Sequence, residues 1–258
     1  MKIGFYDSGL GGIKTLKDII DMGLKEEIYF LADEKNRPYG IKSAEEIQKI
    51  AIENVKILID LGCKIVVVAC NTATSVAIET LRNQFKNIEI IGTEPAVNLA
   101  VKENLNKNIL VLATTITVKG DKLKKLIKHL KFNSKIDLLA VDKLVTLIED
   151  KNFINNQEEV NNYLKEILGR YNLSSYSHII LGCTHFPIVK ENIEYILKQN
   201  NVETKVIDGN EGIGRNLFRK IGNKQGNFFS LKIITTQENE AFNKRVKEIL
   251  KDIKYDIL

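Results

Sequence analysis

Two of the three cysteines stand in nearly matching sequence contexts. The segment 64–72 reads KIVVVACNT and the segment 178–185 reads HIILGCTH, so each apolar run ends in a small residue, a cysteine and then polar residues. A thiol can act as an acid or a base because its pKa is about 8.5, and a helix N-terminus lowers that pKa. Both motifs are typical of strand-to-helix turns, so Cys70 and Cys183 are predicted to be two acid/base thiols. Taken singly, each would be interpreted as a buried apolar side chain.

Two other chemistries use some of the same residues. A zinc site would draw on Cys70, His178, Cys183 and His185. The sequence has no CxxC or HxxxH spacing, however, and His178 begins an apolar run rather than ending one. A Cys–His nucleophile for acyl transfer would use Cys183 with His185 and would leave Cys70 without a role. The third cysteine, Cys63, lies between an expected helix and an expected strand, which indicates a structural residue.

A glycine-rich segment, Asp7-Ser8-Gly9-Leu10-Gly11-Gly12, follows the first expected strand and precedes an expected helix. It matches neither the GxGxxG fingerprint nor a P-loop. Its backbone N–H groups could bind a carboxylate, as N–H groups at a helix start often do. Alternatively, the glycines serve only a tight strand-to-helix turn. Both interpretations stay open.

The composition is that of a globular protein. The chain has 258 residues, is 44% hydrophobic and 28% charged, and carries a formal net charge of +5, which suits one large domain or two small ones. Three cysteines leave one over, which disfavours a disulfide framework. With no signal-peptide pattern and no apolar run of about 20 residues, a cytoplasmic location is predicted. The lysine-rich segment 119–131 has apolar residues at helical spacing and is interpreted as an amphipathic helix rather than a nucleic-acid-binding surface.

Short apolar runs alternate with longer amphipathic segments along the chain. Strands are expected at residues 2–6, 28–31, 64–69, 88–91, 108–112, 135–140, 178–181, 204–207 and 229–235. Helices between most of these strands predict an α/β fold with mostly parallel sheets flanked by helices. Ser43-Ala44-Glu45-Glu46 fits a capping box at one helix start, and Pro187 suits the first turn of another helix.

The internal similarity predicts two similar α/β lobes. Residues 1–95 and 207–258 are expected to form the lobe that carries Asp7 and Cys70, and residues 96–206 the lobe that carries Cys183 and His185. Open α/β sheets bind ligands at the C-terminal ends of their strands. Lobes that face each other would put the two cysteines on opposite walls of one cleft, where the active site is expected.

Further motifs resemble those of one known family. In chain order they are the glycine-rich segment, Pro38-Tyr39-Gly40, Ala69-Cys70-Asn71-Thr72-Ala73, Gly92-Thr93-Glu94-Pro95, Ala113-Thr114-Thr115-Ile116-Thr117-Val118 and Leu181-Gly182-Cys183-Thr184-His185. This order resembles that of glutamate racemases, within the wider aspartate/glutamate racemase group, from residue 1 to about residue 242. The two cysteine motifs together are highly specific, whereas the glycine turn alone is weak.

The resemblance implies an isomerase that racemises an amino acid without pyridoxal phosphate, another cofactor or a metal. One cysteine removes the α-proton and the other returns a proton to the opposite face, because a single base would tend to return it to the face it came from. By the same resemblance, Asp7 assists Cys70, and His185 and Glu149 assist Cys183. The implied substrate-binding residues are Asp7, Ser8, Pro38, Tyr39, Gly40, Asn71, Thr72, Thr117, Thr184 and His185. For Glu149, a solvated helix acid is a comparably simple interpretation.

The residue after Cys-Thr indicates the substrate. His185 resembles glutamate-specific members, whereas aspartate-specific members commonly carry Glu there. The resemblance thus implies conversion of L-glutamate to D-glutamate for peptidoglycan and cell wall biogenesis, with aspartate or another small acidic amino acid as the alternative substrate. A non-catalytic binding protein on the same fold is the alternative class. A small-molecule substrate, no nucleic-acid or membrane partner, and a homo-oligomer, most simply a dimer, complete the expectation.

Three positions depart from the family pattern. The usual Phe before the first aspartate is Tyr6, the usual Cys-Pro pair before the Glu149 segment is Val141-Asp142, and the usual late Asp-Ser-Gly motif is Asp208-Gly209-Asn210. The second departure weakens the local alignment at Glu149. None of the three involves the cysteines.

Overall fold

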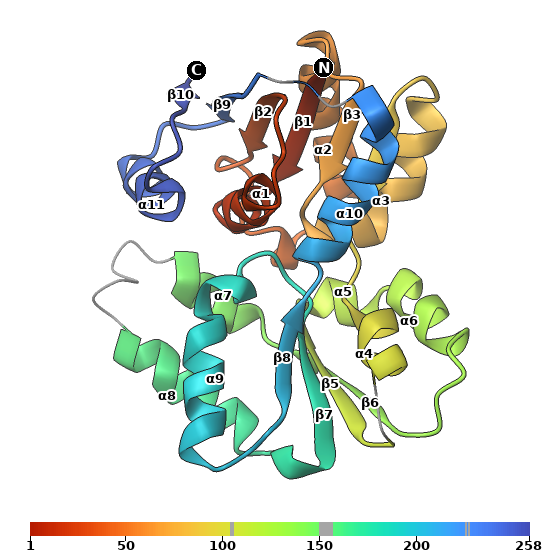
Figure 1. Cartoon of the computed structure of the whole chain (residues 1–258), viewed down its shortest axis with the longest axis vertical. Helices are drawn as coiled ribbons and strands as arrows, with labels where there is room; N and C mark the ends of the chain where they lie inside the picture. The colour runs from red at the N-terminus through yellow and green to blue at the C-terminus, as the bar shows by residue number, and fades with distance from the viewer. Residues whose placement is uncertain (104–105, 150–156, 225, 227) are drawn as a thin grey trace. The chain divides into compact units, whose positions relative to one another are not determined.

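The chain folds into two compact units in the computed structural model, which describes all residues except 104–105, 150–156, 225 and 227 (Figure 1). The first unit comprises Met1–Thr93 and Asn210–Leu258, and the second comprises Glu94–Gly209. The second unit is therefore inserted into the sequence of the first. Outside the four gaps, no helix is long and apolar enough to cross a membrane.

The first unit is built on a parallel sheet, six-stranded in the part of the chain that the structure describes. Its strands are β1 (Lys2–Asp7), β2 (Glu27–Ala32), β3 (Ile65–Val68), β4 (Glu89–Gly92), β9 (Ser230–Thr235) and β10 (Asp256–Ile257). They lie in the order β10-β9-β2-β1-β3-β4, and every pairing is parallel. The central strands are buried on both faces, which is why they read as continuous apolar runs rather than alternating ones.

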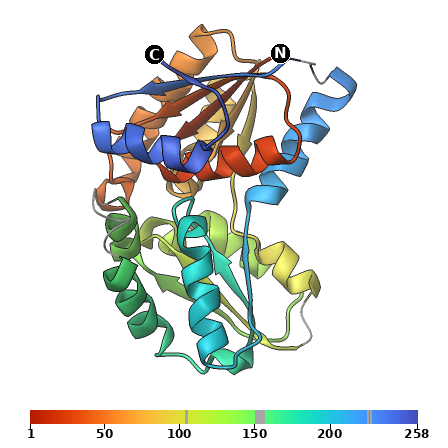
Figure 2. The same cartoon turned by 60° about the vertical axis from the view of Figure 1, so that its left-hand side comes forward.

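Helices cover both faces of this sheet. They are α1 (Gly11–Asp21), α2 (Ala44–Asp60), α3 (Asn71–Gln84), α10 (Asn210–Ile221) and α11 (Glu240–Leu250), with short 3₁₀ turns η1 (Tyr39–Ile41) and η4 (Gly222–Lys224). Helix α1 packs with α10 and α11, and α2 packs with α3; Figure 2 shows α1 and α11 in front of the strands. The predicted capping box is confirmed, since Ser43 Oγ accepts from Glu46 N–H at 3.2 Å and Glu46 Oε2 accepts from Ser43 N–H at 2.8 Å.

The second unit has a parallel sheet with strand order β6-β5-β7-β8. Its strands are β5 (Asn108–Ala113), β6 (Ile136–Ala140), β7 (Tyr176–Leu181) and β8 (Lys205–Asp208). Its helices are α4 (Val97–Glu103), α5 (Thr115–Lys119), α6 (Asp121–Lys128), α7 (Asp142–Glu149), α8 (Gln157–Leu168) and α9 (Lys190–Gln199), with 3₁₀ turns η2 (Leu173–Ser175) and η3 (Phe186–Val189).

Strand β5 shows how this unit builds two cores. Leu110 and Leu112 belong to the cluster under α7, α8 and α9, whereas Ile109 and Val111 belong to the cluster under α4 and α6. Successive side chains of a strand point to opposite faces, so each sheet face receives its own apolar layer. In Figure 1, α8 and α9 lie on one side of the strands and α4 and α6 on the other.

The fold class predicted from the sequence is confirmed, and each expected strand overlaps an observed one. The lysine-rich segment 119–131 forms the expected amphipathic helix over α6, although Lys119 belongs to α5 on the other side of Gly120. Pro187 lies in the first turn of a helical segment as expected, but this turn is the 3₁₀ turn η3, which runs directly into α9 at Lys190. Strand β10 was not expected.

Candidate functional site

Cys70 lies two residues beyond β3, at the start of α3. Its Sγ accepts a hydrogen bond from the Ala73 N–H at 3.4 Å, as the N-cap of the helix, and lies 3.6 Å from Ser8 Oγ. The side chain is buried. A helix N-terminus favours a negative charge on the capping atom, so this position favours the thiolate over the thiol. Asn71 and Thr72 are buried in the first turn of the same helix.

Asp7 ends β1 with a fully buried carboxylate. Its Oδ1 accepts from the N–H groups of Gly9 at 3.3 Å and Gly12 at 3.0 Å. A Cβ atom on Gly12 would lie 2.4 Å from Asp7 Cβ, so only glycine allows this approach. The segment is therefore a turn that needs glycine, and two of its N–H groups bind the carboxylate of Asp7 in the chain itself.

Tyr39 connects the segment Pro38-Tyr39-Gly40 to two other buried side chains. Its hydroxyl lies 2.5 Å from Tyr6 Oη and 2.6 Å from Asp33 Oδ2. Burial raises the pKa of both tyrosines, and nearby negative charges raise it further. The turn η1 contacts α3, so the Pro38–Gly40 segment and the Cys70 helix lie side by side. Neither Tyr6 nor Asp33 was predicted as a site residue; the signal for Asp33 was a charged residue directly after the apolar run 28–32.

Cys183 lies two residues beyond β7 and is buried. Its Sγ lies 3.6 Å from His185 Nδ1, and His185 Nε2 forms a short ion-pair contact with the Glu149 carboxylate. The structure thus brings together the thiol, imidazole and carboxylate that the resemblance implies. Thr184, between the first two, is also buried.

The surroundings of His185 favour the charged form of its imidazole. Burial by itself lowers the pKa of the imidazole, but the Glu149 carboxylate and the Cys183 sulfur raise it by more, so that it lies well above its ordinary value. An imidazolium beside a thiol can hold the thiolate form or share a proton with it. The chemical environments of the two thiols therefore differ: Cys70 has a helix N-terminus, and Cys183 has a histidine.

The turn after β5 holds Thr117. Thr114 caps α5, and its Oγ1 lies 3.0 Å from Thr117 Oγ1 in a buried contact. The Asp142 carboxylate accepts from the Thr115 N–H at 3.1 Å and from Thr115 Oγ1 at 2.5 Å. Asp142 begins α7 two residues beyond the end of β6, so it connects the loops that follow two neighbouring strands, β5 and β6. The departure from the family's Cys-Pro pair thus has a structural role in this chain.

Other candidate residues lie elsewhere. His178 lies five residues before Cys183, roughly 16 Å away in extended chain, and contacts Ser177 at 3.0 Å and Glu103 at 3.4 Å. His178 is therefore too far along the chain from Cys183 to share a metal ion with it. Among the residues that the structure describes, no three His, Cys, Asp or Glu side chains form a metal-ligand group. Cys63 is fully buried, and burial raises its pKa to about 11, as suits a structural residue.

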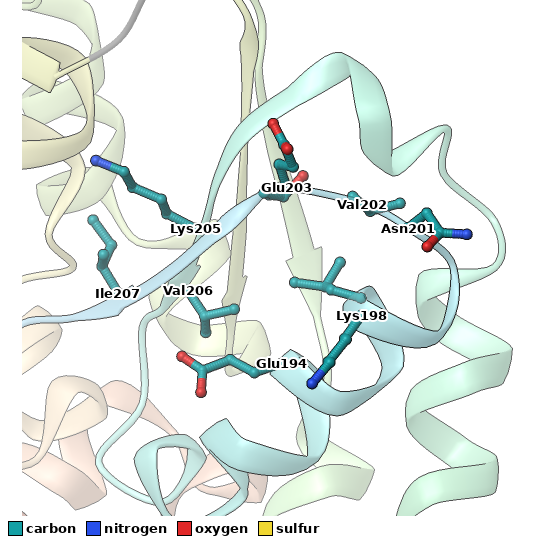
Figure 3. Close-up of a pocket in the computed structure, with 10 residues that line it drawn as sticks. Glu194, Lys198, Asn201, Val202, Glu203, Lys205, Val206 and Ile207 are labelled. Carbon is teal, nitrogen blue, oxygen red and sulfur yellow. The ribbon is translucent and has the colours of Figure 1, made fainter.

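A surface hollow of about 600 Å³ lies away from both cysteines. Figure 3 shows its position between the C-terminal half of α9 and the edge strand β8. Its charged lining residues are Glu194, Lys198, Glu203 and Lys205. Because charges of both signs line it and no candidate site residue does, it is not the candidate functional site.

Known proteins resemble this chain over most of its length. A glutamate racemase of Campylobacter concisus is 44% identical over 226 residues, covering 87% of this chain and 84% of that protein. One of Halothermothrix orenii is 37% identical over 259 residues, covering 98% and 100%. The crystal structure of a glutamate racemase of Bacillus anthracis matches with a TM-score of 0.86 at 27% identity, covering 99% of this chain and 96% of that one. That of Francisella tularensis, in complex with D-glutamate, matches with a TM-score of 0.81 at 27% identity, covering 100% and 96%.

The fold, the two cysteine sites and these likenesses define a class of enzyme: an isomerase that acts as a racemase. The model of the Asp/Glu/Hydantoin racemase family matches residues 17–212. The chain belongs to this family.

Proposed function

We propose that this protein interconverts L-glutamate and D-glutamate with Cys70 and Cys183 as its two acid/base groups. The observation that carries the proposal is that each unit holds a buried cysteine in the same place, two residues beyond the third strand of a four-strand arrangement that the two sheets share, β2-β1-β3-β4 and β6-β5-β7-β8. Two matched thiols suit a reaction in which a proton leaves one face of a carbon and another arrives at the opposite face.

In the proposed reaction, one thiolate removes the α-proton and the other thiol donates a proton to the opposite face. The roles reverse for the other enantiomer. The start of α3 stabilises the Cys70 thiolate, and Asp7, held by the glycine turn, assists it. His185 lies beside Cys183, where it can exchange a proton with the sulfur, and is itself oriented by Glu149. The α-hydrogen is far less acidic than a thiol, so positioning and charge stabilisation must lower the barrier.

The remaining proposed roles concern substrate binding. In the first unit, Ser8 contacts Cys70, Asn71 and Thr72 follow Cys70 in α3, and the segment Pro38-Tyr39-Gly40 lies beside that helix. Thr117 and Thr184 belong to the unit that holds Cys183. Backbone and hydroxyl groups of this kind suit the amino and carboxylate groups of an amino acid. Glutamate is the proposed substrate because His185 follows Cys-Thr and because the relatives above are glutamate racemases. The D-glutamate would supply peptidoglycan biosynthesis.

The test is to incubate the purified protein with L-glutamate, without pyridoxal phosphate, and to follow the circular dichroism signal of the amino acid. We expect the signal to decay to zero as the racemate forms, and solvent deuterium to enter the α-position in heavy water. A parallel reaction with L-aspartate separates the two acidic substrates. A signal that persists at high enzyme concentration, with no deuterium uptake, would reject racemisation of glutamate.

A further inference from the structure

Tyr6 is a buried polar residue next to the Cys70 site to which the mechanism above gives no role. Its side chain is fully buried, and its strand neighbour in the register is Val68, two residues before Cys70. Its backbone carbonyl accepts from the Ala69 N–H at 2.9 Å. The charge of Cys70 also contributes to raising the pKa of Tyr6, after the larger effect of burial. Tyr6 is therefore fixed by the sheet beside the candidate thiol.

Two side chains, Tyr39 and Asn54, interact with the Tyr6 hydroxyl, and the direction of the hydrogen bond between the two tyrosines can be deduced. Asp33, when ionised, only accepts, and it is fully buried with three side-chain neighbours: Thr236 Oγ1 at 2.8 Å, Asn36 Nδ2 at 3.0 Å and Tyr39 Oη at 2.6 Å. Tyr39 has a single O–H, and it donates this hydrogen to Asp33. The contact of 2.5 Å between the two tyrosine hydroxyls must then be a bond that Tyr6 donates and Tyr39 accepts.

These bonds hold the Tyr39 hydroxyl from two sides. Asp33 follows β2 and Tyr6 belongs to β1, so both holding groups are anchored on neighbouring strands of the same sheet. Tyr39 itself lies in η1, outside any strand. The aromatic rings of Tyr6 and Tyr39 also form a tilted pair, at 53° with their centroids 6.5 Å apart, and a phenylalanine at position 6 would keep this ring contact.

We propose that Tyr6 is a positioning residue: its hydroxyl fixes Tyr39, and through Tyr39 the Pro38–Gly40 segment, relative to Cys70. The inference rests on the proposed function, in which that segment binds the substrate. Tyr6→Phe keeps the ring and removes only the donor.

The test is steady-state racemisation of D- and L-glutamate by wild type, Tyr6→Phe, Tyr39→Phe and the double variant. Tyr6→Phe should raise KM about 2- to 10-fold, the range expected for the loss of one neutral hydrogen bond, and change kcat less than about twofold. In the Tyr39→Phe background, Tyr6→Phe should have almost no further effect, because the bond is already missing. Thermal melts of all variants establish that they are folded.

Tyr29→Phe is the matched control. Tyr29 is a buried tyrosine of the neighbouring strand β2 whose hydroxyl donates to Glu27 at 2.9 Å and lies 3.3 Å from Lys232 Nζ, away from η1. It should leave KM unchanged. An unchanged KM in Tyr6→Phe, or effects that multiply in the double variant, would overturn the positioning role while wild-type turnover still supports the proposed function. Absence of wild-type turnover would instead reject the proposed function.

Discussion

Cys70 and Cys183 occupy equivalent positions in two copies of one topology. Four neighbouring strands lie in the same order in each sheet, β2-β1-β3-β4 in one unit and β6-β5-β7-β8 in the other. Each cysteine follows the third of these strands in the chain, β3 or β7. Each is separated from its strand by one small residue, Ala69 or Gly182, whose N–H bonds back to the first strand at 2.9 Å and 2.7 Å. The correspondence extends to the first strands, where Asp7 matches Ala113. The scaffold is repeated, but the groups that assist each thiol are not.

Replacing either motif cysteine should abolish turnover without unfolding the protein. We expect Cys70→Ser and Cys183→Ser to lower kcat for racemisation at least about 100-fold. A hydroxyl is a far weaker acid than a thiol, so its deprotonated form is hardly populated at neutral pH. Cys63→Ser is the control: it places a hydroxyl in a fully buried apolar site, so it should lower the melting temperature and spare kcat. Wild-type turnover in Cys183→Ser would contradict the two-thiol mechanism.

The His185–Glu149 pair should make stability depend on pH in a defined direction. The folded-state pKa of His185 is raised above the value of about 6.5 in an unfolded chain. Its contribution to stability is therefore complete below about pH 6.5 and is lost as the pH rises through the folded-state pKa. The difference in melting temperature between wild type and His185→Gln should shrink from pH 6 to pH 9.

His178 gives the opposite sign and serves as the control for that experiment. Burial lowers its pKa, although Glu103 partly offsets the effect. Its contribution to stability is therefore present at high pH and falls as the pH drops below about 6.5. The melting-temperature difference between wild type and His178→Gln should shrink toward low pH. Parallel pH trends for the two variants would argue against the charge states inferred for them.

The glycine turn should not tolerate a side chain at position 12. A Cβ on Gly12 would lie 2.4 Å from Asp7 Cβ and 3.0 Å from Phe30, so Gly12→Ala must displace the Asp7 carboxylate. We expect a loss of about 1–3 kcal/mol in the free energy of unfolding and a lower kcat. In Gly212→Ala, within α10, the new Cβ meets nothing within 4 Å, so urea unfolding should show equal or higher stability.

Asp142 should stabilise the turn that carries Thr117. Asp142→Ala removes the acceptor of the Thr115 N–H and hydroxyl, and we expect a loss of about 1–2 kcal/mol in the free energy of unfolding. If Thr117 binds substrate, KM for glutamate should rise as well. Asp121→Ala, at an exposed first-turn acid of α6, should cost only a few tenths of a kcal/mol. Chemical denaturation of both variants measures the contrast.

Local patterns were enough to predict most of the fold. The strands were readable because each is a short apolar run, and the cap at Ser43 because its partner is three residues away. Strand β10 was not, since its two residues are exposed and only pairing with β9 defines it. The site was predictable where motifs are contiguous, as at Cys183 and His185. The Tyr6–Tyr39–Asp33 contacts were not, because they join different elements that no sequence period connects.

The interruption of the first unit by the second has a consequence for biosynthesis. Strand β9, which pairs with β2, belongs to the part of the chain that follows the inserted Glu94–Gly209 unit. A ribosome therefore releases every strand of the inserted unit before it releases the last partner that the N-terminal strands require. One edge of β2 therefore stays unpaired while the inserted unit is translated. The first unit begins first in the chain but is completed last.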